Sequence, residues 1–348
     1  MNWIRSLSGS WRDKSKLSGQ REKSDKPPLI ILTGPTAVGK TGLSIELAKR
    51  IGGEIISADS MQVYRGMDVG TAKVTKEEMD GVPHHLIDIL EPTEAFDVTL
   101  FQRLAGQAVQ EILGRGKLPI LVGGTGFYIQ ALLYGIDFTE EDSGEIERDK
   151  LRCELEKIAE TPEGLESLVE ELRTVDPKAL LTIHPNNKKR VIRAVEYFRI
   201  HQAPISAHNE AEREKSSVYN SCYFVLTMDR EKLYQRIEQR IDIMLEQGLV
   251  SEVRRLHAAG CGKEHISMQG IGYKEILEYL DGETTYEEAV TKLRTNTRHY
   301  AKRQLTWFRR EKDVIWLDKD ELGSDEEILQ RIIFEINNMG ISHGKYDK

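Results

Sequence analysis

Cysteine is scarce in this sequence. The chain has 348 residues and three cysteines, Cys153, Cys222 and Cys261, which lie far apart and form no CxxC pair. An odd number of isolated cysteines argues against a disulfide framework and against a zinc site. Free thiols are typical of a reducing compartment, so we expect a cytoplasmic protein.

Long apolar runs are also missing. None approaches the ~18 residues that a membrane-spanning helix needs, so no membrane partner is expected. The first 27 residues are polar and lack the apolar core of a signal peptide. We interpret residues 1–27 as a flexible polar tail that ends at the Pro27-Pro28 pair.

Overall positive charge is the third absence. The formal net charge is −8 and the isoelectric point is about 5.7. A nucleic-acid partner would therefore have to be bound by local basic clusters rather than by a global field. Hydrophobic residues make up 39% of the chain, enough for a sizeable core, and the length favours about two domains.

What is present is an alternation of short apolar runs with helical patterns. Such alternation predicts a parallel sheet with right-handed crossovers. Strands are expected at residues 29–33, 54–59, 86–90, 118–124, 222–228 and 314–317. Helices are expected at residues 39–51, 98–113, 230–246, 250–259, 270–280 and 286–310. We assign residues 28–138 and 220–320 to this core, and residues 321–348 to a C-terminal helix and tail.

The composition changes at about residue 139. Residues 139–171 contain thirteen acidic and four basic residues by count, and their periodicity is helical with no strand pattern. Prolines divide the following segment into short helices. We therefore predict that residues 139–219 form an all-helical insertion domain.

A phosphate-binding pattern lies between the first strand and the first helix. Residues 34–41, GPTAVGKT, fit G-x-x-x-x-G-K-[ST] in the strand–loop–helix context that this P-loop motif requires. Its glycines let the backbone wrap around phosphate oxygens, and the helix N-terminus supplies a positive dipole. Lys40 adds a charge, and the Thr41 hydroxyl is placed to bind Mg²⁺. The predicted phosphate-binding residues are Gly34, Pro35, Thr36, Ala37, Val38, Gly39, Lys40 and Thr41. The fold class is thus α/β, with a P-loop parallel sheet flanked by helices and a helical insertion.

Asp59 follows the strand after the P-loop helix. Ligands of open parallel sheets bind outside the carboxyl ends of the strands, so this carboxylate could face a transferring group as a base. It could equally cap a turn with Ser57 and Ser60. No guanine-reading NKxD segment follows the loop, which argues against an ordinary NTPase.

Positive charge is concentrated in two places. One is residues 188–193 of the insertion, and the other is residues 298–312, with six basic residues and one acidic by count. Both could contact RNA phosphates, or could be solvated helix faces. Arg240 lies in the amphipathic segment RIEQR, where pairing with a glutamate across one helical turn is an ordinary alternative to a binding role.

The segment ADSMQVYRGMDVGTAK, residues 58–73, resembles the tRNA dimethylallyltransferases (isopentenyl-tRNA transferases) of bacterial type. The resemblance covers roughly residues 28–317, and the polar extension before it lies outside the family pattern. Further matching segments are PHHLID, LVGGTGFY, IHPNNKKRVIRAVE, RIEQRIDIML, IGYKE and AKRQLTWFR.

This resemblance implies transfer of a dimethylallyl group from dimethylallyl diphosphate to the exocyclic N6 amine of the adenosine 3′ of the anticodon in tRNA. Asp59 would be the general base, Thr41 and Arg240 would contact the diphosphate, and Mg²⁺ would be the cofactor. The expected partners are dimethylallyl diphosphate and the tRNA anticodon stem-loop, with a monomer as the working unit. The implied tRNA contacts are Asp59, Ser60, Met61, Gln62, Thr125, Arg148, Lys189, Arg190, Val191, Ile192 and Arg193.

Three other functions compete with this one. An adenylate (AMP) prenyltransferase would share the P-loop and Asp59 but has no use for a basic helical insertion. A small-molecule P-loop kinase would use Asp59 on a hydroxyl and would need ATP. A non-catalytic RNA-binding module would leave the intact P-loop unexplained.

Overall fold

The protein is built on one parallel sheet of six strands. The computed structural model of the chain describes residues 25–136 and 145–341. The strand order is β3-β2-β4-β1-β5-β6, and every neighbouring pair is parallel. The strands are β1 (Pro28–Thr33), β2 (Gly53–Ala58), β3 (His84–His85), β4 (Leu118–Gly123), β5 (Asn220–Thr227) and β6 (Val314–Asp318).

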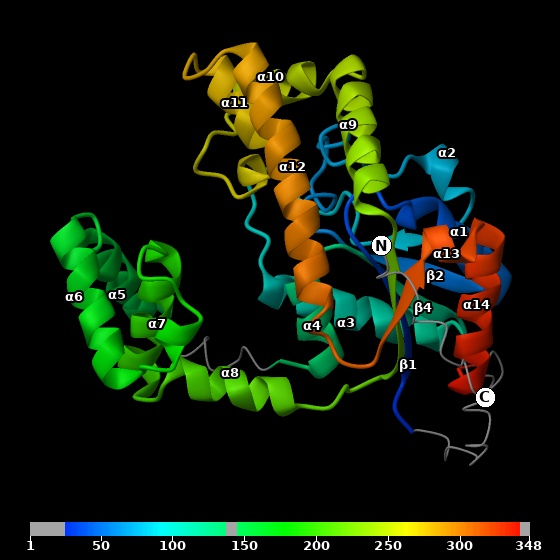
Figure 1. Cartoon of the computed structure of the whole chain (residues 1–348), viewed down its shortest axis with the longest axis horizontal. Coiled ribbons are helices and arrows are strands. Elements are labelled where there is room, and N and C mark those ends of the chain that lie inside the picture. The colour runs from blue at the N-terminus through cyan, green and yellow to red at the C-terminus, as the bar shows by residue number, and fades with distance from the viewer. Residues whose placement is uncertain (1–24, 137–144, 342–348) are drawn as a thin grey trace, which may run out of the picture.

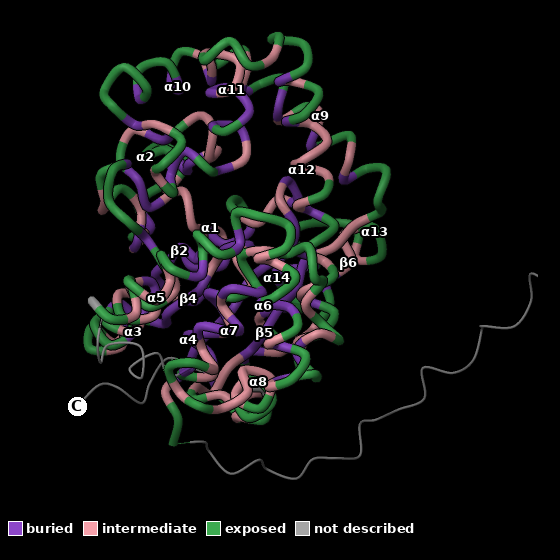
Figure 2. The backbone as a smooth tube through the Cα atoms, turned by 90° about the vertical axis from the view of Figure 1, so that its left-hand side faces the viewer, coloured by how far each residue is buried: buried purple, intermediate pink, exposed green. Residues whose placement is uncertain are grey.

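The central strand explains why these runs are apolar. All six residues of β1 are buried, and Ile30 lies opposite both Ile120 of β4 and Cys222 of β5. A strand covered on both faces has no polar side to show, so its sequence is continuously apolar instead of alternating. Figure 2 shows this buried centre with exposed segments around it.

Helices cover both faces of the sheet (Figure 1). On one face, α1 (Lys40–Ile51) and α14 (Asp325–Asn338) pack against each other and on β2, β4 and β5. On the other, α3 (Val98–Gly114) and α4 (Gly126–Tyr134) pack together, with α3 against β2 and β4. The predicted α/β core is confirmed.

A lobe of helices stands beyond the carboxyl ends of the strands (Figure 1). It contains α9 (Arg230–Glu246), α10 (Leu249–Ala258), α11 (Tyr273–Leu280) and the long α12 (Tyr286–Phe308), which returns to the sheet. The short helices are α2 (Lys76–Met79) and α13 (Lys319–Leu322). Among residues 25–136 and 145–341, no helix is both long and apolar enough to cross a bilayer.

The described part of the insertion contains helices joined by loops and no strand. It contains α5 (Glu145–Ile158), α6 (Pro162–Val175), α7 (Lys188–His201) and α8 (Ile205–Glu214), and Figure 1 shows α5–α7 as a separate lobe. The lobe has its own apolar cluster, formed by Leu155, Ala159, Leu168, Val169, Leu172, Ala179, Val191, Ile192, Ala194 and Val195. Of the predicted boundaries, residues 139–144 and the tail at residues 1–24 lie outside the described residues.

The predicted strand at residues 86–90 is wrong. The third strand is only His84–His85, and the backbone then takes left-handed conformations at Leu86 (φ 64°) and Asp88 (φ 55°). Such positive φ values are incompatible with an extended strand. The turn brings the Asp88 carboxylate to the ammonium of Lys73, whose Nζ donates a hydrogen bond of 2.5 Å to it.

Candidate active site

A cavity of about 350 Å³ lies at the carboxyl edge of the sheet. It is enclosed by the P-loop, the turn after β2, residues 70–72, and helices α9, α11 and α12. This is where ligands of open parallel sheets bind. Its polar lining includes Thr36, Asp59, Ser60, Arg240, Tyr300 and Arg303, and its apolar lining includes Met61, Ile237, Ile241, Met244, Ile271 and Leu293.

The P-loop is shaped by backbone conformations that favour glycine. Gly34 has φ 148°, and a Cβ there would lie 2.6 Å from the carbonyl oxygen of Leu226. Gly39 precedes α1 with φ 97°, and Ala37 is also left-handed at φ 64°. The loop thus curls around the N-terminus of α1, whose first turn exposes Thr41. This geometry suits an anion, because the N-terminus of a helix carries the positive end of its dipole.

Lys40 folds back over the loop. Its Nζ donates hydrogen bonds of 2.9 Å to the carbonyl oxygen of Gly34 and 2.8 Å to that of Pro35. Burial and the neighbouring Arg240 guanidinium lower the pKa of Lys40 to about 7, against the opposing effect of Asp59. A charged ammonium here is costly without an anion, so the site is suited to a polyphosphate.

We expect anion binding to be coupled to protonation of Lys40. With a pKa of about 7 in the free protein, Lys40 is mostly neutral at about pH 8, and a bound diphosphate favours its charged form. Binding at that pH should therefore take up about one proton more in the wild type than in Lys40→Met, and this difference should vanish near pH 6. Calorimetry of inorganic diphosphate binding in buffers of different ionisation enthalpy measures it; an equal uptake by both proteins would contradict it.

Asp59 both caps a turn and lines the cavity. Its Oδ1 accepts hydrogen bonds from the amides of Met61 (2.8 Å) and Gln62 (3.3 Å), so it caps the turn after β2. The same side chain lines the cavity, and Oδ2 remains for a further partner. Thr125 lies beside this turn, because its amide donates to the carbonyl oxygen of Ala58 (3.3 Å).

The predicted contacts after Asp59 do not all face the cavity. Ser60 and Met61 line it, whereas Gln62 does not. The Gln62 amide Nε2 instead donates to the carbonyl oxygens of Thr71 (3.3 Å) and Ala72 (3.4 Å). Gln62 therefore ties the Asp59 turn to the next wall of the cavity.

Arg240 reaches the cavity from α9. Burial and Arg236 lower the pKa of Arg240, and Asp59 opposes this effect. The alternative pairing with Glu238 is not what the structure shows, because Glu238 forms ion pairs with Arg294 and Arg298 of α12. Arg240 is thus left for a ligand of the cavity.

Two further groups at the site were missed by the sequence analysis. Arg236, one turn before Arg240 on α9, donates from Nε to the carbonyl oxygen of Ala37 (2.7 Å). Gln304 of α12 accepts from the amide of Thr36 (2.9 Å) and donates to the carbonyl oxygen of Gly124 (3.0 Å). The spacing of Arg236 and Arg240 by four residues was a usable signal, but nothing local marks Gln304.

Tyr300 lies one turn before Gln304 and faces the cavity. Burial and the nearby Asp59 carboxylate raise the pKa of Tyr300, against its hydrogen bonds with Thr125 and Gln304. The phenol therefore stays protonated at neutral pH. Its hydrogen bond with Thr125 links α12 to the segment that follows β4.

Removing the Gln304 amide should destabilise the protein. In Gln304→Leu, the Thr36 amide and the Gly124 carbonyl lose their partner in a largely buried place. We expect a loss of about 1–3 kcal/mol of unfolding free energy, the usual penalty for an unpaired buried polar group. Urea denaturation measures this loss, and the exposed neighbour Lys302→Leu serves as the control.

On the insertion, the predicted RNA contacts separate into three groups by exposure. Lys189 and Arg190 are exposed at the start of α7, whereas Val191 (0% exposed) and Ile192 (5%) belong to the lobe's core. The side chains of Val191 and Ile192 are thus turned away from any RNA, which is a correction. Two arginines are half-buried: Arg148 on α5 and Arg193, 3.6 Å from Glu196.

The fold and this cavity define a phosphate-binding α/β enzyme with a helical insertion. The sequence pattern of the IPP transferase family matches residues 62–311, and that of the isopentenyl transferases matches residues 27–91. The chain therefore belongs to the IPP transferase family, which confirms the predicted resemblance.

Named relatives agree with this membership. A tRNA dimethylallyltransferase of Lachnoclostridium phytofermentans is 58% identical over 306 residues, which are 88% of this chain and 96% of the relative. Among solved structures, the tRNA isopentenylpyrophosphate transferase of Bacillus halodurans is 45% identical with a TM-score of 0.67, covering 90% of this chain and 98% of that one. A eukaryotic dimethylallyltransferase acting on tRNA has a TM-score of 0.75 at 30% identity, covering 92% and 81%.

Proposed function

We propose that the protein transfers a dimethylallyl group from dimethylallyl diphosphate to the N6 amine of a tRNA adenosine, the one 3′ of the anticodon. One observation carries the proposal. Thr36 of the phosphate loop and Arg240 share a single cavity of about 350 Å³ with Asp59 and an apolar wall, and Lys40 of the same loop lies close enough to Arg240 and Asp59 for both to affect its pKa. These are the groups that a diphosphate leaving group, an amine acceptor and a branched hydrocarbon require.

The donor is bound at both of its chemically distinct parts. The P-loop amides, Lys40 and Arg240 receive the diphosphate, and they stabilise the charge that develops on it as the allylic C–O bond breaks. The apolar lining of Ile241, Met244 and Leu293 suits the dimethylallyl chain and excludes water from its cationic carbon.

Asp59 acts on the acceptor of the transfer, the exocyclic amine of the adenosine. Adenine's exocyclic amine is a weak nucleophile because its lone pair is delocalised into the ring. Asp59 accepts a hydrogen bond from this amine and then takes its proton as the new C–N bond forms. The turn that Asp59 itself caps fixes its carboxylate, so the base is held in place before the amine arrives.

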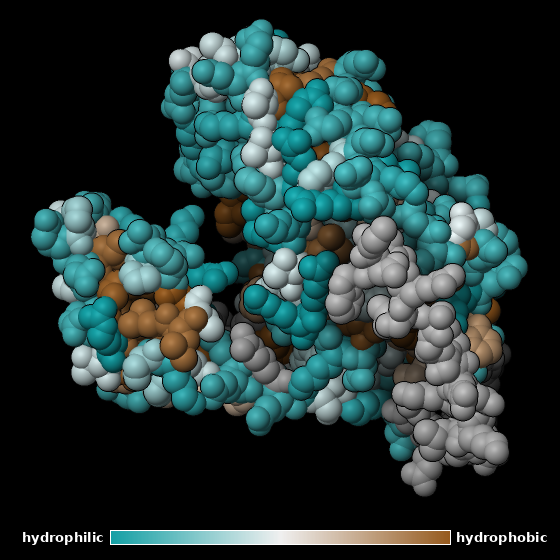
Figure 3. Space-filling view, in the orientation of Figure 1, coloured by the Kyte–Doolittle hydropathy of each residue, from teal (hydrophilic) through white to brown (hydrophobic). Residues whose placement is uncertain are grey.

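The tRNA is bound between the insertion and α12. Figure 3 shows a deep recess between these two parts of the surface. Both parts carry exposed basic residues: Lys189 and Arg190 on α7, and Lys302 and Arg303 on α12. Phosphate contacts from both sides would hold the anticodon stem-loop, whose unpaired base can be extruded into the cavity. One chain supplies all these groups, so a monomer suffices.

Mg²⁺ is proposed as a cofactor that arrives with the donor. In the described part of the chain, no three acidic, histidine or cysteine side chains are grouped to hold a metal ion. The exposed Thr41 hydroxyl at the start of α1 fits a site completed by diphosphate oxygens and water. When bound, the ion would neutralise charge on the diphosphate.

Incubation with labelled dimethylallyl diphosphate and undermodified tRNA tests the function. We expect label in tRNA without added ATP, at a single adenosine 3′ of the anticodon. Label transferred to AMP in preference to tRNA would support the mononucleotide alternative. A strict need for ATP would support the kinase, and no transfer at all would overturn the proposal.

A further inference from the structure

Glu252 of α10 is a buried carboxylate that accepts four hydrogen bonds. It is 6% exposed. Its Oε2 accepts from the backbone amides of Asp68 and Val69, both at 2.9 Å. Its Oε1 accepts from the amide of Gly70 (3.0 Å) and from the Tyr273 hydroxyl (2.6 Å). Three consecutive amides form the kind of concave donor group that elsewhere binds free anions, and here a side chain from 182 residues away occupies it.

The loop held by Glu252 is a wall of the cavity. Gly70, Thr71 and Ala72 all line it, as does Tyr273. Tyr273 lies so close under the loop that a Cβ on Gly70 would be 2.5 Å from the phenol ring. Burial and Glu252 raise the pKa of Tyr273, so its hydroxyl stays protonated and donates to the carboxylate.

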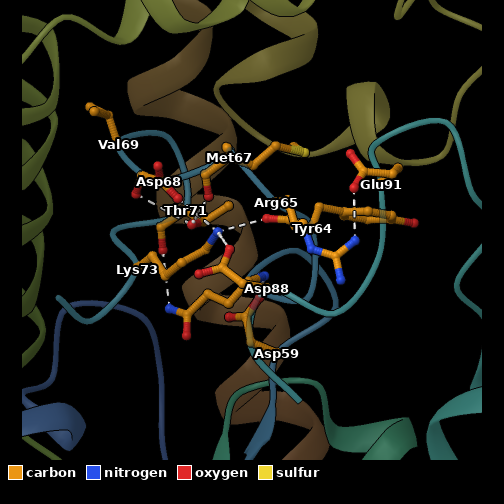
Figure 4. A network of polar contacts seen from close by, with 12 residues as sticks. Asp59, Tyr64, Arg65, Met67, Asp68, Val69, Thr71, Lys73, Asp88 and Glu91 are labelled. Carbon is orange, nitrogen blue, oxygen red and sulfur yellow. Dashed lines mark hydrogen bonds and ion pairs between the residues drawn. The ribbon is translucent and has the colours of Figure 1, made fainter. Parts of the chain in front are cut away.

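The far end of the same loop is fixed by other groups. Lys73, with 4% of its side chain exposed, donates to the Tyr64 carbonyl (2.6 Å) and binds Asp68 (2.8 Å) and Asp88. Figure 4 shows this network next to Asp59. Gln62 connects the loop to the turn that Asp59 caps. Its side-chain amide donates to the loop carbonyls, and its backbone amide donates to Asp59. Displacement of residues 68–72 would therefore be transmitted to the base.

We propose that Glu252 is a positioning residue for the transfer reaction, acting through residues 68–72 on the cavity wall and through Gln62 on Asp59. This inference rests on the proposed function. A charged acceptor gives hydrogen bonds roughly twice as strong as a neutral one, which suits a loop that has no regular structure of its own. A shift of about 1 Å in such a wall can cost about 10²-fold in rate.

Glu252→Gln tests the inference while preserving the side chain's shape. The glutamine NH₂ would face donors where the carboxylate accepted hydrogen bonds, so the loop must move. We expect kcat per folded molecule to fall by about 10–100-fold, with the dissociation constant for tRNA changed by less than about twofold, since the phosphate contacts lie elsewhere. Glu275→Gln is the matched control: Glu275 is 2% exposed and binds the Gly272 amide and Asn296, not the loop.

Tyr273→Phe provides a milder second variant. It removes one of the four donors and keeps the ring under Gly70, so a smaller fall in kcat in the same direction is expected. Amide proton shifts of residues 68–70 should move upfield in Glu252→Gln, as hydrogen bonds to a charged acceptor are lost.

The outcomes separate this inference from the function. A kcat within about twofold of wild type for folded Glu252→Gln, or equal losses in Glu275→Gln, would overturn the positioning role. If Glu252→Gln does not fold, a kcat of Tyr273→Phe equal to that of the wild type would overturn the positioning role. Absence of transfer by the wild-type protein would instead overturn the proposed function.

Discussion

Replacing Asp59 by alanine is expected to lower kcat by about 10²–10⁴-fold, the contribution typical of a general base. The base is needed only as the amine attacks, so the loss should fall on kcat and leave tRNA binding nearly intact. Single-turnover rates with saturating tRNA and donor, together with filter binding of the tRNA, measure the two effects. Near-wild-type turnover would refute the role.

Asp59→Asn separates the base from the turn cap. Asparagine keeps a side-chain oxygen that can accept from the Met61 and Gln62 amides, as Asp59 Oδ1 does, but it cannot take a proton. We expect kcat of Asp59→Asn to be nearly as low as that of Asp59→Ala, with more of the stability retained. Asp97→Ala is the matched control, because Asp97 caps α3 by accepting a hydrogen bond from the Leu100 amide (2.8 Å). This substitution should lower the free energy of unfolding by about 1 kcal/mol and leave kcat unchanged.

Local sequence patterns predicted the parts of the site that one segment builds by itself. The P-loop needs only its glycines, Lys40 and the flanking strand and helix, all within a short stretch. Asp59 was found because the end of β2 is a fixed place relative to that loop. Neither required knowledge of how distant helices pack.

Groups delivered by distant helices were not predictable in the same way. Gln304 reaches Thr36 across 268 residues, and Glu252 reaches Gly70 across 182. Their identities as site residues depend on where α12 and α10 pack, which no short pattern encodes. The strand predicted at residues 86–90 failed for a related reason, because Asp88 turns to meet the buried Lys73.

The error at Val191 and Ile192 was avoidable. Helical periodicity places about every third or fourth residue on the same face. A helix through 188–201 with Val191, Ile192 and Val195 on one face must bury them, and this leaves Lys189 and Arg190 outside. A segment that matches a family can contain buried residues, so RNA contacts should not be predicted along its whole length.

Arg240→Met is expected to lower kcat by about 10²–10³-fold, as for loss of one preorganised donor at a developing anion. Arg240 shares the cavity with Asp59, and the nearby Glu238 of its own helix is paired with α12 instead. Its interaction with the diphosphate strengthens as the C–O bond breaks, and only such a strengthening raises kcat. Methionine keeps much of the side chain's volume, so packing of α9 changes little.

The two kinetic constants decide whether Arg240 acts on the transition state or only binds the donor. A fall in kcat and kcat/KM together would assign it to the transition state, whereas a raised KM for dimethylallyl diphosphate with unchanged kcat would show uniform binding and contradict the prediction. Arg236→Met should have the smaller effect, because Arg236 is exposed and holds the Ala37 carbonyl. Arg254→Met, an exposed position on α10, controls for loss of one positive charge: a comparable loss there would mean that net charge, not the place of the guanidinium beside the leaving group, sets the rate.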